Sequence, residues 1–227
     1  PHDPTDGQLR ADGFLARTVA DVAVASSLIT FPGQPRVTRT EWVPGASNVG
    51  VPSRRLRVGI LTKPLHSAGQ NAPHPAPHGA SHPAPRPASN SLMMGALRIA
   101  ADRVRAAGHD VVPVTNPYPP ETIELLRIVL AYRCRNLDGA LSPLSTYFRD
   151  LGTTITAEQY KDTLARLREL PDLVLSQWSD AANVDLVLNP TIAYPPPPVG
   201  TFAALPPEED FAAQTAWTPW CTLWNLT

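Results

Sequence analysis

The sequence predicts an α/β fold, because stretches with strand character alternate with stretches that repeat apolar residues at helical spacing. Residues 56–62 (LRVGILT) alternate and are rich in branched side chains, which is typical of a strand. An amphipathic helix and a second strand-like run at residues 111–114 follow. We therefore expect a β-α-β unit over residues 56–115, inside a mixed sheet flanked by helices.

Two segments precede this unit. Residues 14–30 repeat apolar side chains at helical spacing, which predicts an amphipathic helix. Arg17 and Asp21 are four residues apart on it, where they would form a surface ion pair worth a few tenths of a kcal/mol. Residues 31–55 are punctuated by proline and glycine and predict a connecting loop.

Within the β-α-β unit, Ser91 is the predicted cap of the helix and Gly108 its end. A right-handed crossover would make the two strands parallel. Pro113 favours an edge or a bulge for the second strand, because proline donates no ladder hydrogen bond. The apolar face of the helix is expected to consist of Leu92, Ala96, Leu97, Ala100, Val104 and Ala107.

More helices are predicted after the second strand. One runs from about residue 121 to 137, and Thr156 with Gln159 forms a capping box ahead of another. Pro171 breaks or kinks that helix, and the pattern then resumes. The residues expected to point inward in the first helix are Ile123, Leu126, Val129 and Leu130, and after the break the helical pattern resumes through Val174, Leu175 and Trp178.

The C-terminal part begins with residues 185–189 (DLVLN), which predict a short buried strand. The four consecutive prolines at 195–198 predict extended, polyproline-like backbone.

Residues 66–90 predict a flexible insertion, because they hold six prolines, six alanines and four histidines. His74, His78 and His82 have the spacing of zinc ligands on a helix. The neighbouring prolines exclude a helix, so a solvated loop without a metal is the favoured interpretation.

Composition narrows the function classes. A formal net charge of −1 gives no electrostatic case for nucleic acid or an anionic membrane as a partner. Neither a signal peptide nor a membrane-spanning run is visible, so a cytoplasmic protein is expected. Cys134 and Cys221 are far apart and predict reduced thiols. No cofactor is expected.

Four ordered blocks resemble the amidase signature family: residues 16–21 (ARTVAD); residues 56–61 (LRVGIL) with 106–112 (AAGHDVV); residues 185–191 (DLVLNPT) with 198–200 (PVG); and residues 218–227 (TPWCTLWNLT). The order of the blocks and their spread along the chain carry the resemblance. Departures include Phe14 at the family's usual proline and the insertion at residues 66–90.

This resemblance implies an enzyme that hydrolyses linear carboxamides to a carboxylate and an amine. The family uses a Ser–Ser–Lys triad on a Gly/Ser-rich loop that precedes the first block. Residues 1–227 therefore resemble one incomplete amidase-type domain, a central-to-C-terminal fragment that lacks the triad and is inactive alone. A small-molecule amide is the expected substrate, and homo-oligomerisation is left open. The alternatives are a non-catalytic remnant or interaction module, and the glutaminase subunit of a tRNA-dependent amidotransferase.

Within these residues, candidate catalytic groups are weak, and none is assigned. The pair Ser26-Ser27 lacks flanking glycines, and Lys161-Asp162 lies in a charged helical pattern, so both are interpreted as coincidences. Cys134 or Cys221 with His109 would make a thiol nucleophile and base, but inert thiols are favoured.

The best candidates for substrate contact are Tyr194, Trp220 and Trp224. With Trp217, the last two form an aromatic stripe at helical spacing. Core packing is the favoured interpretation of this stripe, and one wall of an acyl-binding pocket is the alternative.

Overall fold

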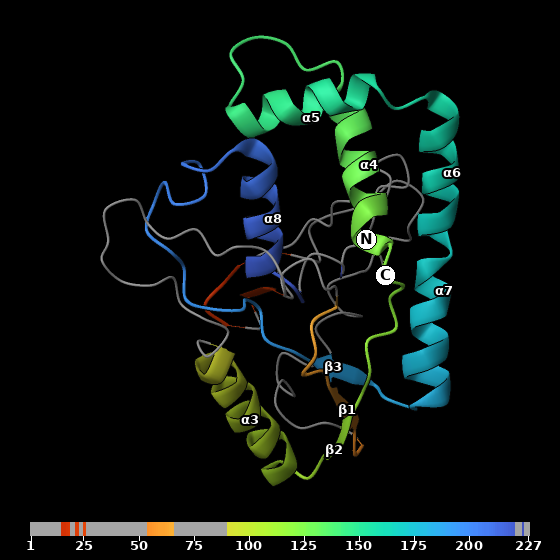
Figure 1. Cartoon of the computed structure of the whole chain (residues 1–227). Helices are drawn as coiled ribbons and strands as arrows, with labels where there is room; N and C mark the ends of the chain where they lie inside the picture. The colour runs from red at the N-terminus through yellow and green to blue at the C-terminus, as the bar shows by residue number, and fades with distance from the viewer. Residues whose placement is uncertain are drawn as a thin grey trace. The chain divides into compact units, whose positions relative to one another are not determined.

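The computed structural model describes residues 15–18, 21, 22, 25, 54–65, 90–220 and 224 (Figure 1). The chain divides into two units, Pro1–Arg55 and Leu56–Thr227. In the first unit, Thr18 begins a helical turn: its Oγ1 accepts from the Asp21 backbone N–H at 3.1 Å, and its carbonyl accepts from Val22 at 3.3 Å. Most of the predicted helix at 14–30, and most of the predicted loop at 31–55, lie outside the described residues.

The second unit contains three parallel strands: β1 (Arg57–Ile60), β2 (Asp110–Pro113) and β3 (Leu186–Leu188), in the order β2-β1-β3. The predicted β-α-β unit and its parallel pairing are therefore confirmed. Pro113 lies in a strand at one edge of this sheet, as expected. The described strands include no antiparallel neighbour of the kind that the expected mixed sheet requires.

β3 differs from the prediction of a buried strand. Leu186 is 54% exposed, and Val187 and Leu188 are half-buried. The reason is topological: β3 has β1 on one side only within the described sheet. A continuous apolar run can therefore belong to a partly exposed edge strand as well as to a central one.

The register between β1 and β3 is held at its start by a reciprocal pair. The Arg57 N–H donates to Asp185 Oδ2 at 2.8 Å, and the Asp185 N–H donates to the Arg57 carbonyl at 2.8 Å. The guanidinium Nε of Arg57 also donates to the Ala182 carbonyl at 3.2 Å. The carboxylate of Asp185 thus takes the place of a carbonyl at the end of the ladder, where backbone donors otherwise lack partners.

α3 (Asn90–Ala106) lies on one side of the sheet, and α7 (Leu170–Leu175) lies on the other (Figure 1). Gly108 ends α3 as predicted, with φ +88°. Its N–H donates to the Arg105 carbonyl, and the N–H of His109 donates to the Val104 carbonyl. These two bonds make a Schellman motif, which requires the left-handed conformation that glycine adopts most readily.

Two details of the α3 prediction were wrong. The helix begins at Asn90, so Ser91 is inside it and does not precede it. Leu92 is 61% exposed, and Ala96 and Ala107 are exposed as well, whereas Leu97 and Ala101 are buried. The three-stranded sheet is narrow, and it covers only one strip of a helix whose apolar residues are spread around its circumference.

A helical layer adjoins the sheet (Figure 1). α4 (Thr122–Cys134) packs against both α5 (Pro143–Thr153) and α6 (Ala157–Arg168), while α8 (Pro207–Trp217) packs against α5. Leu126 and Val129 of α4 are buried, as predicted. Leu130 was predicted to point inward but is 36% exposed, because α5 and α6 contact other faces of α4.

The helix boundaries follow local chemistry. Thr156 and Gln159 form the predicted capping box, with bonds of 3.1 and 2.8 Å. α6 ends at Arg168 and α7 places Pro171 in its first turn, which confirms the predicted break. A π-helix, η3 (Ser176–Ala181), continues α7. The helical pattern does continue through Val174, Leu175 and Trp178, of which Val174 and Trp178 are buried and Leu175 is exposed.

α5 has no counterpart among the predicted elements. Ser142 caps it by accepting from the Ser145 N–H at 3.1 Å, and Pro143 occupies its first turn. Phe148 of α5 meets Phe211 of α8 edge to face, with ring centroids 5.0 Å apart. Such an aromatic pair ties the two helices together. None of the helices in the described part of the chain combines the length and the hydropathy that a membrane span requires.

The α4–α5 crossing depends on a glycine, and it generates a stability prediction. A Cβ on Gly152 would lie 2.0 Å from the Ala131 carbonyl oxygen, which is backbone and cannot rotate away. Gly152→Ala should lower the free energy of unfolding by about 3 kcal/mol, the upper range for overpacking, as measured by urea denaturation. Gly95→Ala in α3 is the matched control, since the nearest atom would be 3.8 Å away at the end of the Arg98 side chain.

In that control, the gain in helix propensity should leave stability unchanged or raise it by up to about 1 kcal/mol. Equal effects of the two substitutions would contradict the close approach of α4 and α5.

Candidate functional site

The carboxyl end of the sheet is the position where open parallel sheets usually bind ligands, at the point where the strand order reverses. Here the chain passes from β1 to β2 on one side and later returns to β3 on the other side of β1. The residues that follow β1, from Leu61 to Leu65, therefore occupy the conventional position of a site. They also lie close to two of the sequence blocks that suggested an enzyme.

Trp220 fills this position from the C-terminal part of the chain. Its side chain is 1% exposed, and its indole Nε1 donates to the Lys63 carbonyl at 3.1 Å. Next to it, the Leu65 N–H donates to the Pro219 carbonyl at 2.9 Å. Leu61 and Leu65 are themselves buried beside these bonds. The end of β1 is therefore closed by protein groups.

Asn116, which follows β2, completes the closure. Its amide Nδ2 donates to the Leu65 carbonyl at 2.7 Å and to the Pro64 carbonyl at 3.3 Å, and its Oδ1 accepts from the Tyr118 N–H at 2.9 Å. Sequence reasoning missed this residue. A polar side chain three residues after a strand and directly before Pro117 is the feature that could identify it.

The predicted contact residues have separate partners. The Tyr194 carbonyl accepts from Trp217 Nε1 at 2.9 Å, and burial raises the pKa of the Tyr194 hydroxyl. Trp224 stacks at a tilt on Trp178, with ring centroids 5.2 Å apart. α8 ends at Trp217, so the tryptophans with helical spacing do not share a helix. Pro219 explains the stop, because a residue that precedes proline disfavours helical backbone.

Of these residues, Trp224 is the one that lines a described pocket. With Trp178, Val184 and Leu186 it borders a space of about 340 Å³ beside β3. The Trp178 indole Nε1 donates to the Thr115 carbonyl at 2.9 Å, which fixes one wall. Tyr194 and Trp220 are buried and belong to none of the described pockets.

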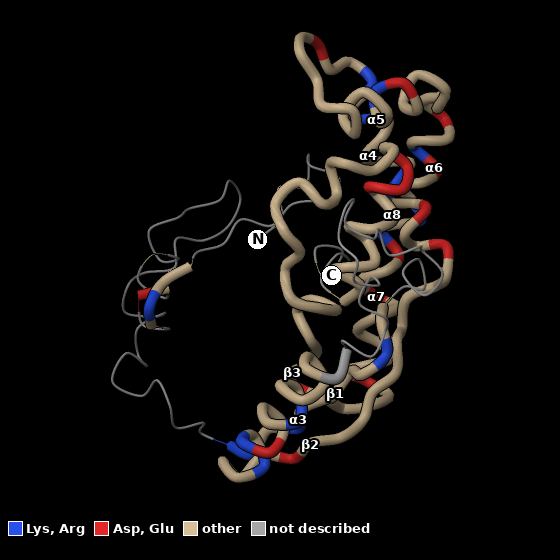
Figure 2. Tube along the Cα trace, turned by 60° about the vertical axis from the view of Figure 1, so that its left-hand side comes forward, with Lys and Arg blue, Asp and Glu red and all other residues tan. Residues whose placement is uncertain are grey.

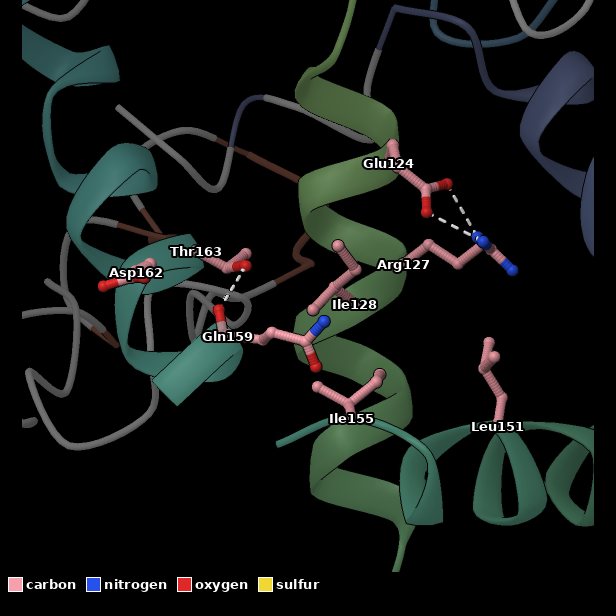
Figure 3. Close-up of a pocket in the computed structure, with 8 residues that line it drawn as sticks. All are labelled: Glu124, Arg127, Ile128, Leu151, Ile155, Gln159, Asp162 and Thr163. Carbon is pink, nitrogen blue, oxygen red and sulfur yellow. Dashed lines mark hydrogen bonds and ion pairs between the residues drawn. The ribbon is translucent and has the colours of Figure 1, made fainter. Parts of the chain in front are cut away.

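A second pocket of about 380 Å³ lies among α4, α5 and α6 (Figure 3). Arg127 donates from Nε and Nη2 to the two oxygens of Glu124, both at 2.7 Å, and from Nη1 to the Tyr147 hydroxyl at 3.2 Å. These bonds raise the pKa of Arg127. Gln159 accepts the Thr156 N–H, and Asp162 points away from α4 (Figure 3). Arg127 and Glu124 are thus engaged with each other, and the polar groups of this pocket do not converge as an acid–base pair.

The remaining catalytic candidates are also accounted for. His109 Nδ1 accepts from the Leu56 N–H at 3.1 Å, and burial raises the pKa of the half-buried Cys134 thiol. Lys161 and Asp162 are exposed on α6, in agreement with the interpretation as a coincidence. Ser26, Ser27, Cys221 and the three histidines lie outside the described residues. Within the described part of the chain, no cluster of three metal-ligating side chains occurs.

Comparisons of the chain with known protein families, with characterised proteins and with solved structures gave no match.

The closure at Asn116 generates a stability prediction. Asn116→Ala removes three hydrogen bonds and leaves the Leu65 and Pro64 carbonyls without this donor, so the free energy of unfolding should fall by about 2–3 kcal/mol. The control is Asn189→Ala, because Asn189 also follows a strand but, among the described residues, its side chain donates to no carbonyl beyond that of its neighbour Pro190. Its cost should stay below about 1 kcal/mol. Urea denaturation measures the free energy of unfolding of both variants. Equal losses would contradict the role of the Asn116 side chain in holding the residues after β1.

The half-buried environment of Cys134 predicts that its thiol loses its proton at a higher pH in the folded chain than in the unfolded chain. Burial raises the pKa of this thiol and outweighs the opposing effect of Arg133. A neutral thiol is therefore favoured in the folded chain, and the resulting stability is present below the unfolded pKa and lost as pH rises through the folded pKa. Alkylation by iodoacetamide, followed by mass spectrometry in a Cys221→Ser chain, should show a higher midpoint in the native protein than in concentrated urea. Identical midpoints would contradict the desolvation of Cys134.

Proposed function

We propose that this chain is the central-to-C-terminal part of an amidase signature hydrolase, which converts a carboxamide to a carboxylate and an amine. The observation that carries the proposal is the order of the resembling blocks. Residues 56–61, 106–112 and 185–191 coincide with β1, the α3–β2 junction and β3, which belong to one sheet. Three blocks that lie far apart in the sequence are therefore parts of the same β-α-β sheet layer.

In this proposal the chemistry is supplied by a Ser–Ser–Lys triad that precedes residue 16. A serine becomes an effective nucleophile only when a base removes its proton, and preorganised backbone amides then stabilise the oxyanion by several kcal/mol. The 227 residues would cover the catalytic sheet and shape the mouth through which the amide enters. The proposed substrate is a small molecule, and neither nucleic acid nor a membrane is a proposed partner.

The geometry refines which aromatic residue would contact the acyl group. Trp220 is buried, and its indole N–H is bonded to the Lys63 carbonyl, so its proposed role is to hold the wall of the site. Trp224 is half-buried beside a pocket of about 340 Å³ and is the better candidate for direct contact. Tyr194 would support the wall through its carbonyl, which accepts from Trp217.

The first experiment concerns the native gene product. Its intact mass should exceed 24.5 kDa, it should release amines from small carboxamides, and a fluorophosphonate probe should label an activated serine. A native mass of 24.5 kDa with no hydrolysis and no labelling would overturn the proposal in favour of a non-catalytic remnant or interaction module. Glutamine hydrolysis that requires partner subunits would instead favour the tRNA-dependent amidotransferase subunit.

A substitution in that product tests the proposed role of Trp224. Trp224→Ala should lower kcat/KM for bulky amides about tenfold more than for small amides, because the lost contact acts only on a large acyl group. Trp220→Phe is the control: it should lower the melting temperature through lost packing and leave the ratio of the two kcat/KM values unchanged. An unchanged ratio in Trp224→Ala would remove Trp224 from the acyl pocket.

A further inference from the structure

A third pocket, which we term the α3 pocket, lies between α3 and the face of the sheet formed by β1 and β2. Its volume is about 400 Å³, which is in the range of small-ligand sites. It is lined by Ile60, Thr62, Met94, Leu97, Arg98, Ala101, Asp102, Arg105, Val111, Val112 and Pro113.

The walls of the α3 pocket are mainly apolar. Ile60 contributes from β1, Val111 and Val112 from β2, and Met94 and Leu97 from α3. The strand residues are half-buried, so the protein has not fully covered them. An apolar group that enters the pocket would remove this area from water, at about 25 cal/mol for each Å².

The charged groups of the pocket all come from α3, where basic and acidic positions gather (Figure 2). Asp102 is the single acidic residue in the lining, and its Oδ1 accepts from Arg105 at 2.8 Å. Arg98 lies four residues before Asp102 but has no hydrogen-bonded or ion-paired partner among the described residues. Two arginines and one aspartate leave one net positive charge at the pocket.

This combination selects a class of ligand. A guanidinium presents planar donors that match a carboxylate, and charge-assisted bonds of this kind are about twice as strong as neutral ones. The adjoining apolar walls favour a ligand that has an apolar body behind its charged group. A fully polar anion such as phosphate would leave those walls exposed to water.

We propose that the α3 pocket binds a small organic monocarboxylate with an aliphatic or aromatic body, whose carboxylate pairs with Arg98. Arg105 adds a second positive charge at the rim, although Asp102 compensates for it. The proposal is independent of the proposed hydrolase function, since it uses only residues of α3, β1 and β2.

The two methionines of the chain provide a local reporter of binding. Met94 lines the α3 pocket, while its neighbour Met93 does not. In the ¹³C-methyl-methionine NMR spectrum of the full chain, titration with octanoate should shift the Met94 signal saturably and leave the Met93 signal in place. A Met93→Leu chain assigns the two signals. If the Met94 signal does not move up to millimolar octanoate, the proposal is overturned.

Variants on the same helix separate the charge from nonspecific apolar binding. Arg98→Gln should raise the Kd for octanoate about tenfold, the loss expected for one charge-assisted contact. Arg103→Gln is the matched control, because Arg103 is also exposed on α3 but does not line the pocket, and its Kd should be unchanged. Equal Kd values for Arg98→Gln and the unmodified chain would overturn the role of Arg98, as would octan-1-ol binding as tightly as octanoate.

Discussion

The backbone carbonyls that follow β1 are the constraint on which the second unit depends. A chain that leaves a buried strand carries polar groups that water cannot reach, and each needs a partner. Here the carbonyls of Lys63, Pro64 and Leu65 receive donors from Trp220 and Asn116. Three distant parts of the sequence, namely the exit of β1, the exit of β2 and the turn after α8, are thereby tied together. The helical layer and the sheet meet at these bonds.

Much of the fold could be predicted from local chemistry, and the errors share one physical cause. The strands, the capping box at Thr156 and the glycine stop at Gly108 depend on residues close in sequence, and the structure contains them all. The exposure of a side chain depends on which elements pack against its helix or strand. The periodicity of one segment carries no information about those packing partners. Leu92, Leu130 and Leu186 were therefore misassigned. α5 has no predicted counterpart, although Ser142 and Pro143 mark its start.

The candidate sites were predictable to a smaller extent. Sequence spacing would pair Arg98 with Asp102, four residues later, yet Asp102 accepts from Arg105. The geometry of the side chains on the folded helix decides which of the two arginines pairs with Asp102. No sequence motif indicates this choice. The tryptophans show the opposite case. Their spacing predicts one stripe, but Pro219 separates Trp217 from Trp220 and Trp224, and the three side chains have different partners. Trp220 shows that an aromatic side chain at the conventional position of a ligand site can instead fill that position.

The reciprocal pair of Arg57 and Asp185 has a consequence for how the protein folds. The two residues are separated by 128 positions, so β3 must find β1 after most of the second unit has been synthesised. A pairing shifted by one residue would reverse the faces of the strand and leave the Asp185 carboxylate without the Arg57 N–H. The Asp185 side chain therefore distinguishes the correct register of β1 and β3 from a shifted one. Because such non-local pairing is slow, formation of the β1–β3 ladder is the step expected to limit the folding rate.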